Sequence, residues 1–511
     1  MDRWANSNWK LPLLSGILLN LGYYTPLLIP NFVAFIPLLY WLDRHPAAGG
    51  FDRFKVGFVF GVVTHGISMH FLWSLLRFSW LGILLYLWLA LTFGLRFGLF
   101  TMGMGWLRRR SGLSWALLLP ACWLPIEWLQ SFGDLRLTID HVSNSLARFP
   151  FVVQFADVVG PYGVALFMLT ANALLHEAML SERRPTARRA TAVLALLLTV
   201  VLAYDLWAWF RPLPAGATLR VGLVQPNIDP TIKWAEDTAQ EQWSTLVRLS
   251  ELVDEQDPDL IVWPETARPH PLYHWLDRPE TYAMNDMSFL AGKLDTAFLT
   301  GVEYVQVRSR DDFDYYNAAM TVDADGVGRG WYGKVYLVAF AEALPFRRLL
   351  GPLLEGREGR EWTLVTGGFT PGKHGQVLEV GGNTIGASIC YEQMFADVPR
   401  AMRNAGAQLQ AVITNDTWYG DTMFQRYQAD ALRLRAIENR SDFVRVSNSG
   451  ISGFVDRRGR FYGATPMYEE AVRVRDVTLS AGRTIYDRIG DAVMWPVALT
   501  LLLAFVRRAR G

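Results

Sequence analysis

A cysteine ends a run of small and apolar residues and is followed by two polar residues, Tyr391 and Glu392. This residue, Cys390, is one of two cysteines in the chain, and the other, Cys122, lies in an apolar run. A thiol at the end of a strand has a rigid backbone, an exposed sulfur and polar neighbours that can lower its pKa, as a nucleophile requires. Taken alone, the stretch favours the plainer alternative of a buried structural cysteine, because free Cys is among the most buried residue types.

Two charged residues also stand at the ends of predicted strands. Glu265 follows the apolar run 260–264, and Lys334 lies in the sequence Tyr-Gly-Lys-Val-Tyr at 332–336. If these side chains meet the Cys390 thiol, the carboxylate can take the thiol proton and return it to a leaving group. The ammonium can stabilise the thiolate and the oxyanion of a tetrahedral intermediate, with backbone N–H groups after the cysteine completing an oxyanion hole. Singly, each charge is more often a solvated surface group, and spacing alone does not show that the three converge.

Composition excludes several other classes of function. The net charge is +1 and no basic stripe with interleaved aromatic residues occurs, so we expect no nucleic-acid partner. The eight His are scattered, and we predict no metal site and no cofactor. Two cysteines cannot form a disulfide framework, although they leave a single bond open.

From Thr218 the chain alternates short β-rich runs with helical stretches. Strands are predicted at 219–225, 259–263, 297–302, 318–322, 377–380, 384–389, 410–414 and 443–446, and helices at about 235–255, 279–293, 395–405 and 425–440. Turn signals at 323–326 and 381–382 indicate hairpins. This alternation predicts an α/β globular domain with helices covering its sheets.

Apolar runs of membrane-spanning length fill the first two hundred residues and recur near the end of the chain. They lie near 11–25, 27–43, 55–77, 80–107, 113–131, 157–180, 190–210 and 492–505. Basic residues gather before the first run, after the second, fourth and sixth, and after the last, which places those loops in the cytoplasm. We therefore predict a multi-pass α-helical membrane domain of eight spans: seven in 1–212, an exported α/β domain at 213–488, and a final span in 489–511.

Several ionisable residues lie inside these runs: His65, His70, Arg77, Arg96 and Glu127. An ionisable group at membrane depth is a functional hypothesis, and the alternative is a structural pair or a side chain that reaches the interface. We expect the structural alternative for His65 and Arg77. Glu127, near the outer end of the fifth run, could equally face a cavity below the globular domain.

These motifs together resemble the nitrilase superfamily, in which a Glu, a Lys and a Cys form a triad in this chain order. The matching motifs are Trp263-Pro264-Glu265-Thr266, Tyr332-Gly333-Lys334 and Ser388-Ile389-Cys390-Tyr391-Glu392. With seven spans before the domain and one after it, the chain resembles the apolipoprotein N-acyltransferase family of bacteria over nearly its whole length. Further matches are Lys233-Trp234, Tyr316-Asn317, Asn415-Asp416-Thr417-Trp418-Tyr419-Gly420, Glu127-Trp128-Leu129 and Gly160-Pro161-Tyr162-Gly163-Val164.

The resemblance implies a nitrilase-like αββα sandwich and a role for each site residue. Glu265 would be the general base and acid, Lys334 the electrostatic stabiliser and Cys390 the nucleophile, with Glu342 as a second glutamate near the triad. Trp234, Tyr391 and Glu392 match positions that the family needs for activity. The alternatives are core packing for Trp234, and packing and helix capping for Tyr391 and Glu392.

The resemblance also implies the partners and the location. The acyl donor would be a membrane phospholipid, and the acceptor the α-amine of the S-diacylglyceryl cysteine that begins an apolipoprotein. The protein would act as a monomer in the bacterial inner membrane, with its catalytic domain on the periplasmic face. The alternatives from other classes are a membrane-anchored amidase or hydrolase that uses water as acceptor, and a non-enzymatic transporter or receptor.

The chain departs from the family pattern at several positions. Gln130 replaces an Arg, residues 133–137 replace a Gly-Phe-Pro-Trp stretch, and Ala339, Ala341 and Ala429 replace a Pro, a Gly and a His. None of them belongs to the triad, so the departures concern the lid and the lipid preference. The Gly-rich insertion 347–372 resembles the family's mobile arm over the site.

Overall fold

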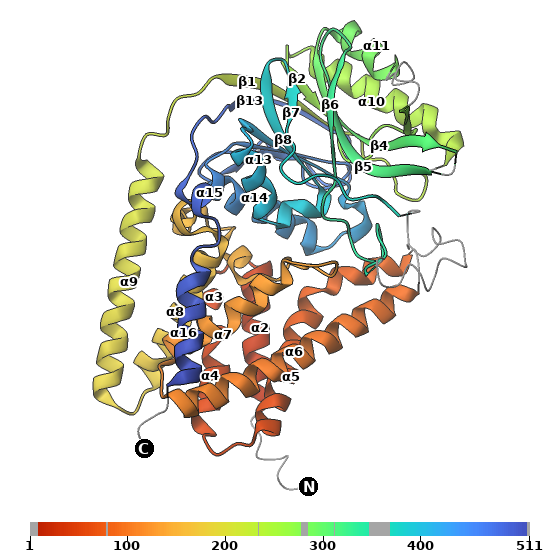
Figure 1. Cartoon of the computed structure of the whole chain (residues 1–511). Helices are drawn as coiled ribbons and strands as arrows, with labels where there is room; N and C mark the ends of the chain where they lie inside the picture. Colours follow the sequence, from red (N-terminus) through yellow and green to blue (C-terminus); the bar gives the residue numbers. More distant parts are fainter. Residues whose placement is uncertain are drawn as a thin grey trace.

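The computed structural model describes residues 9–77, 80–233, 235–276, 285–310, 312–346 and 368–507. Helices fill the first part of the chain, and two β-sheets with flanking helices form the second part (Figure 1). The predicted arm at 347–372 lies outside the described residues up to 367.

The helical part begins with short elements and continues with long ones. They are α2 (Lys10–Tyr24), α3 (Ile29–Val33), α4 (Ile36–Arg44), α5 (Gly50–Ser68), η1 (His70–Arg77), α6 (Leu81–Ser111), α7 (Trp115–Gln130), α8 (Ala156–Leu180) and α9 (Arg184–Phe210). The predicted run at 27–43 forms two helices, each with a proline in its first turn, where the missing N–H costs nothing. The last helix, α16 (Met494–Val506), packs beside α7 and α6 (Figure 1).

Among the described residues, three helices are long and apolar enough to cross a membrane. They are Gly82–Ser111, Ala156–Leu180 and Arg184–Phe210, and the pair Gly50–Ser68 and His70–Arg77, bent by 51°, would make a fourth. The hairpin of α5 and α6 is close-packed because glycines let the backbones touch: a Cβ on Gly57 would lie 2.1 Å from the carbonyl oxygen of Phe97. The helical region is therefore of membrane type.

The second part contains two facing sheets. The first has the order β13-β1-β2-β4-β5-β6, with β3 beside β4, and the second has the order β12-β11-β10-β9-β8-β7. The first comprises β1 (Thr218–Gln225), β2 (Leu260–Val262), β3 (Leu272–Trp275), β4 (Ala297–Ser309), β5 (Asp312–Val322), β6 (Gly328–Gly333) and β13 (Ala471–Thr478). The second comprises β7 (Leu378–Val380), β8 (Asn383–Ile389), β9 (Leu409–Thr414), β10 (Phe443–Ser447), β11 (Gly453–Val455) and β12 (Phe461–Tyr462).

Alternating side chains explain the layers. Leu260 and Val262 of β2 belong to the core between the two sheets, whereas Ile261 and Trp263 pack in the core below the outer helices. Those helices are α10 (Ala239–Asp254) and α11 (Asn285–Leu294) on the first sheet. On the second sheet they are α13 (Asp397–Asn404) and α14 (Met423–Asn439). The result is the predicted αββα sandwich.

All eight predicted strands are present, with boundaries that move by a few residues, and the predicted hairpin at Gly381 and Gly382 joins β7 to β8. Five strands lie outside the predicted set: β3, β6, β11, β12 and β13. Two of them, β6 and β11, contain glycine, and β13 alternates valine with arginine, so these strands show little continuous apolar signal.

The two parts meet along α14 and the segment 131–141, which follows α7. Hydroxyl groups hold this segment in place: Tyr391 donates to the carbonyl of Arg136 at 2.9 Å and Tyr23 to that of Asp140. The carboxylate of Asp140 also pairs with His65 at 3.0 Å, so His65 has the expected structural partner. These buried contacts join the globular domain to the helices.

Glu127 also serves the junction. Its Oε1 accepts hydrogen bonds from the Trp123 indole and the Val142 amide, each at 2.8 Å. It is buried, and the cavity is lined by its neighbours Ile126, Leu129 and Gln130 instead. The structural alternative therefore holds for Glu127.

Candidate active site

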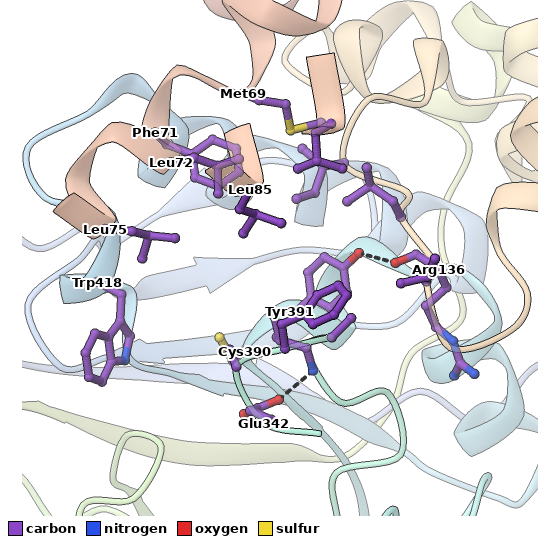
Figure 2. Close-up of a pocket in the computed structure, with 18 of the residues that line it drawn as sticks. Met69, Phe71, Leu72, Leu75, Leu85, Arg136, Glu342, Cys390, Tyr391 and Trp418 are labelled. Atoms are coloured by element: carbon purple, nitrogen blue, oxygen red, sulfur yellow. Dashed lines mark hydrogen bonds between the residues drawn. The ribbon is translucent and has the colours of Figure 1, made fainter. Parts of the chain in front are cut away.

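Cys390 stands at the carboxyl end of β8 and begins the short helix η6 (Cys390–Met394). Its φ is +54°, a left-handed conformation that costs a non-glycine residue energy and is typical of strained functional turns. The residue is only 7% exposed. The sharp turn directs the thiol away from the strand and into the space between the two parts of the protein (Figure 2).

Glu265 follows β2 and reaches the same edge of the domain. Its Oε1 accepts from the Asn317 amide at 2.7 Å and lies 3.5 Å from the Lys334 ammonium, while Oε2 accepts from the Asn415 backbone N–H at 2.8 Å. Gly301 on β4 makes room for it, since a Cβ there would lie 2.7 Å from the Cα of Glu265. The carboxylate is therefore held on both oxygens.

Lys334 follows β6 and lies between two carboxylates. Its Nζ donates to Oε1 of Glu342 at 2.7 Å and to Oε1 of Glu265 at 3.5 Å, and its side chain is 1% exposed. Oε2 of Glu342 accepts from the Val338 amide at 2.8 Å, which closes the loop between the lysine and this second glutamate. The structure thus brings Glu265, Lys334, Glu342 and Cys390 to one site.

Strand direction explains this convergence. β2 and β4 are parallel, and β6 has the same direction as β4 because both are antiparallel to β5. Glu265 and Lys334 therefore follow strand ends at one edge of the first sheet. The second sheet presents the end of β8, with Cys390, to the same edge.

Electrostatics favour a neutral thiol beside a charged lysine. Burial raises the pKa of Cys390 above its ordinary value, and the negative charge of Glu265 raises it further, against the opposing effect of Lys334. Burial lowers the pKa of Lys334, but Glu342, Glu265 and Cys390 together raise it above the usual lysine value. The thiol therefore needs a base to become a nucleophile, and the carboxylate of Glu265 is suited to that task.

Glu392 is buried behind the turn that carries the thiol, whereas Tyr391 lines the cavity. The Glu392 carboxylate accepts from the Tyr332 hydroxyl and from the amides of Val335 and Tyr336 on one oxygen, and from the Ile389 amide on the other. It is fully buried and joins the Cys390 turn to the segment after Lys334. Tyr391 lines the cavity, whereas Trp234 lies outside the described residues.

Sequence reasoning assigned no role to several polar neighbours of the triad. Asn317 donates to Glu265 at 2.7 Å and to Glu342 at 3.3 Å, and so bridges the two carboxylates. The Lys233 ammonium, which is buried, donates to the carbonyl of Glu265 and to the Thr266 hydroxyl. The only sequence signal for a role of these two residues was their place in the motifs Tyr316-Asn317 and Lys233-Trp234, which match the family pattern.

His270 and His274 are four residues apart, a metal-ligand spacing that the prediction overlooked. His274 lies on the strand β3 and its ring contacts the Tyr304 hydroxyl at 2.7 Å. Among the described residues, no group of three or more His, Cys, Asp or Glu could hold a metal ion.

A cavity of about 680 Å³ joins the triad to the helical part. One wall carries the site residues Glu265, Asn317, Lys334, Glu342 and Cys390. The other walls are mostly apolar and come from η1, α6, α7 and the segment 131–139; they include Met69, Phe71, Leu72, Leu75, Leu85, Trp88, Leu89, Ile126 and Leu129 (Figure 2). Such a cavity suits a substrate with a long apolar chain and a polar reacting group.

Most of the departures from the family pattern lie along this cavity, whereas Ala429 is buried in α14 and is not one of its lining residues. Gln130, Leu135, Arg136, Ala339 and Ala341 all contribute to its walls. Between the two alanines, Phe340 has a φ of +65° and its ring meets Trp88 of α6 edge-on, with 6.3 Å between the ring centres. The chain-specific residues thus shape the space for the substrate rather than the triad.

Comparisons with known proteins agree with both parts of this structure. Residues 220–486 match the carbon-nitrogen hydrolase family, and residues 15–174 match the apolipoprotein N-acyltransferase N-terminal domain. Apolipoprotein N-acyltransferase of Gloeobacter violaceus is 32% identical over 494 residues, which cover 94% of this chain and 89% of that protein. Those of Chlorobaculum tepidum and Geobacter metallireducens are 30% and 29% identical and cover 96% and 99% of this chain, and 95% and 97% of their own lengths. The chain therefore belongs to the apolipoprotein N-acyltransferase family and carries a carbon-nitrogen hydrolase domain.

Proposed function

We propose that this protein transfers a fatty acyl chain from a membrane phospholipid to the α-amine of the S-diacylglyceryl cysteine at the start of apolipoproteins. The observation that carries the proposal is the cavity, which has Cys390, Glu265 and Lys334 on one wall and apolar helices on the others. An acyl chain can lie among the apolar side chains while its ester carbonyl reaches the thiol. The family relationship supports the same reaction.

In the first step the Cys390 sulfur attacks the ester carbonyl of the phospholipid. Glu265 takes the thiol proton, and Lys334 with backbone N–H groups stabilises the oxyanion of the tetrahedral intermediate. Glu265 then gives the proton to the departing alcohol oxygen, so that a lysophospholipid leaves and the acyl chain remains as a thioester on Cys390. In the second step the α-amine of the acceptor attacks this thioester, an amide forms, and the sulfur leaves as the thiol.

The other site residues hold the triad in place or form the wall of the substrate cavity. Glu342 holds Lys334 at 2.7 Å and keeps the ammonium between the two carboxylates. Glu392 is a positioning residue because its four hydrogen bonds fix the turn that carries Cys390. Tyr391 forms part of the substrate wall. We assign Trp234 to the substrate side of the site on the family resemblance alone.

We place the chain in the inner membrane as a monomer with eight spans, seven in 1–212 and one in 489–511, and the catalytic domain 213–488 on the periplasmic face. Two contacts made by arginines at helix ends support the placement of these ends on the same, cytoplasmic side of the membrane. Arg110 at the end of α6 donates to the carbonyl of Phe505 in α16 at 3.0 Å, and Arg44 at the end of α4 pairs with Glu182 at 3.4 Å. This orientation is tested by introducing a cysteine at residue 182 or at residue 379 and labelling it with a membrane-impermeant thiol reagent. The labelling is compared between intact spheroplasts, where only the periplasmic side is accessible, and lysed spheroplasts.

The mechanism is tested by intact mass spectrometry of the purified protein after incubation with a phospholipid of defined acyl chains. We expect one acyl adduct that hydroxylamine removes and that the Cys390→Ala variant does not form. An adduct that persists in Cys390→Ala refutes the nucleophile.

Addition of a synthetic S-diacylglyceryl lipopeptide should then discharge the wild-type adduct and yield the N-acylated peptide. Rapid release of free fatty acid without any lipopeptide would show instead that water is the acceptor and that the protein is a hydrolase.

A further inference from the structure

A third carboxylate, Glu303, lines the cavity from β4, the strand between β2 and β5. It lies on β4, directly opposite Asn317 of β5 in the antiparallel register. Directly opposite residues share a face of the sheet, with their Cβ atoms about 5 Å apart. Asn317 in turn donates to Glu265, and Glu303 lines the cavity together with Cys390. Glu303 is therefore a neighbour of the thioester site.

A hydroxyl and an ammonium group near Glu303 hold its side chain in place. The Tyr315 hydroxyl donates to its Oε2. Lys233 lies close enough that Glu265, Glu303 and Cys390 all favour its charged form, although burial is the larger effect and lowers the pKa of Lys233 to about 8. Of the titratable groups around Glu303, Lys233 and Tyr315 interact with it directly, and Tyr273 interacts with Tyr315. Glu265, Lys334, Glu342 and Cys390 line the same cavity as Glu303.

The proton balance of the second step requires a second group that can accept a proton, in addition to Glu265. An α-amine has an ordinary pKa of about 7.7–8.0 and is mostly an ammonium at neutral pH. When an ammonium becomes an amide, its nitrogen forms a bond to the acyl carbon and loses two protons. The carbon–sulfur bond breaks, and the Cys390 sulfur regains only one of these protons. Glu265 can carry that proton, but it cannot hold both.

We propose that Glu303 binds the ammonium of the acceptor and removes its first proton, so that the neutral amine can attack the thioester. Glu265 then transfers the second proton from nitrogen to sulfur, and Glu303 releases its proton to water through the cavity. An apolar cavity favours this transfer because an ammonium and a carboxylate become two neutral groups, and neither charge remains desolvated. This inference rests on the proposed function and adds a residue to its second step.

The test separates the two steps in wild type and in Glu303→Gln, which keeps an oxygen for the Tyr315 hydroxyl. Acyl-enzyme is first formed from phospholipid and quantified by intact mass, and lipopeptide is then added at pH 6, 7 and 8. Formation of the acyl-enzyme should be unchanged within about twofold, because the first step involves no amine. If wild type itself forms no acyl-enzyme, the proposed function fails, and that outcome is distinct from a failure of this inference.

For the second step, the variant should use only the amine that is already neutral in solution. With an amine pKa of about 7.8, transfer should fall roughly 60-fold at pH 6, roughly sevenfold at pH 7 and less than about twofold at pH 8, relative to wild type. Hydroxylamine, which is neutral at pH 7, should discharge the thioester equally fast in both proteins. The matched control Glu379→Gln changes an exposed carboxylate on β7 and should behave as wild type throughout.

Two results would overturn the role of Glu303. One is a transfer rate in Glu303→Gln that equals wild type at pH 6 and pH 7. The other is an equal loss at every pH together with slower discharge by hydroxylamine, which would identify a structural contribution instead.

Discussion

The substitution Glu392→Gln tests whether this glutamate positions the nucleophile turn or contacts a substrate. Its two oxygens accept four hydrogen bonds: from the Tyr332 hydroxyl at 2.9 Å and the Val335 and Tyr336 amides at 2.7 and 3.2 Å, and from the Ile389 amide at 2.8 Å. An amide nitrogen cannot accept, so the glutamine must leave at least one buried donor unpaired. The smallest loss arises if its NH2 group faces Ile389, the residue before Cys390.

An unpaired buried donor costs about 1–3 kcal/mol, and more if the lost partner was charged. The strained Cys390 turn lies beside this donor, so we expect the cost to appear as misplacement of the thiol in the transition state of acylation. About 1.4 kcal/mol corresponds to a tenfold change in rate, which predicts acylation that is roughly 10- to 100-fold slower. Transfer from acyl-enzyme already formed should fall by a similar factor, because the same turn carries the leaving sulfur.

The assay follows the acylated fraction of the enzyme by intact mass after rapid mixing with excess phospholipid. Tyr332→Phe removes one hydroxyl donor and leaves the carboxylate with its three amide partners, so its effect should be smaller than that of Glu392→Gln. The exposed Glu379→Gln serves as the unaffected control. Acylation of Glu392→Gln within twofold of wild type would refute the positioning role, and normal acylation with failed transfer to the lipopeptide would show a substrate contact instead.

Three further predictions follow from the site and its cavity. Glu265→Gln should abolish acylation yet speed alkylation of Cys390 by iodoacetamide at pH 8, because the negative charge that helps to raise the thiol pKa is gone; slower alkylation would contradict this electrostatic picture. Gly301→Ala should cost roughly 1–3 kcal/mol of stability and displace Glu265, so we expect a lower unfolding temperature and slower acylation. The control Gly292→Ala should be neutral, because a Cβ at that position would meet its nearest atom only at 3.9 Å. Leu85→Trp should fill part of the cavity and shift acylation from palmitoyl towards octanoyl donors, judged by adduct mass; the same shift in Leu84→Trp, on the exposed face of α6, would refute a chain site at Leu85.

Much of the fold was predictable because its signals are local. Strand and helix positions in the sandwich followed from apolar runs and turn residues, and the membrane character followed from the length of the apolar runs. The individual spans were harder to predict. Prolines divide the run at 27–43 into short helices, and the run at 55–77 bends by 51° between α5 and η1, which length and hydropathy do not reveal.

The sequence by itself determined which residues could do chemistry: a thiol, a carboxylate and an ammonium, each within three residues of a strand end, in one chain order. Their convergence was decided by the tertiary structure, because only the direction of β2, β6 and β8 in two facing sheets brings 265, 334 and 390 to one edge. Asn317, Lys233 and Glu303 are likewise defined by strand pairing and burial, which join residues far apart in the chain. The apolar cavity exists only where the sandwich meets the helices, since neither part alone encloses it.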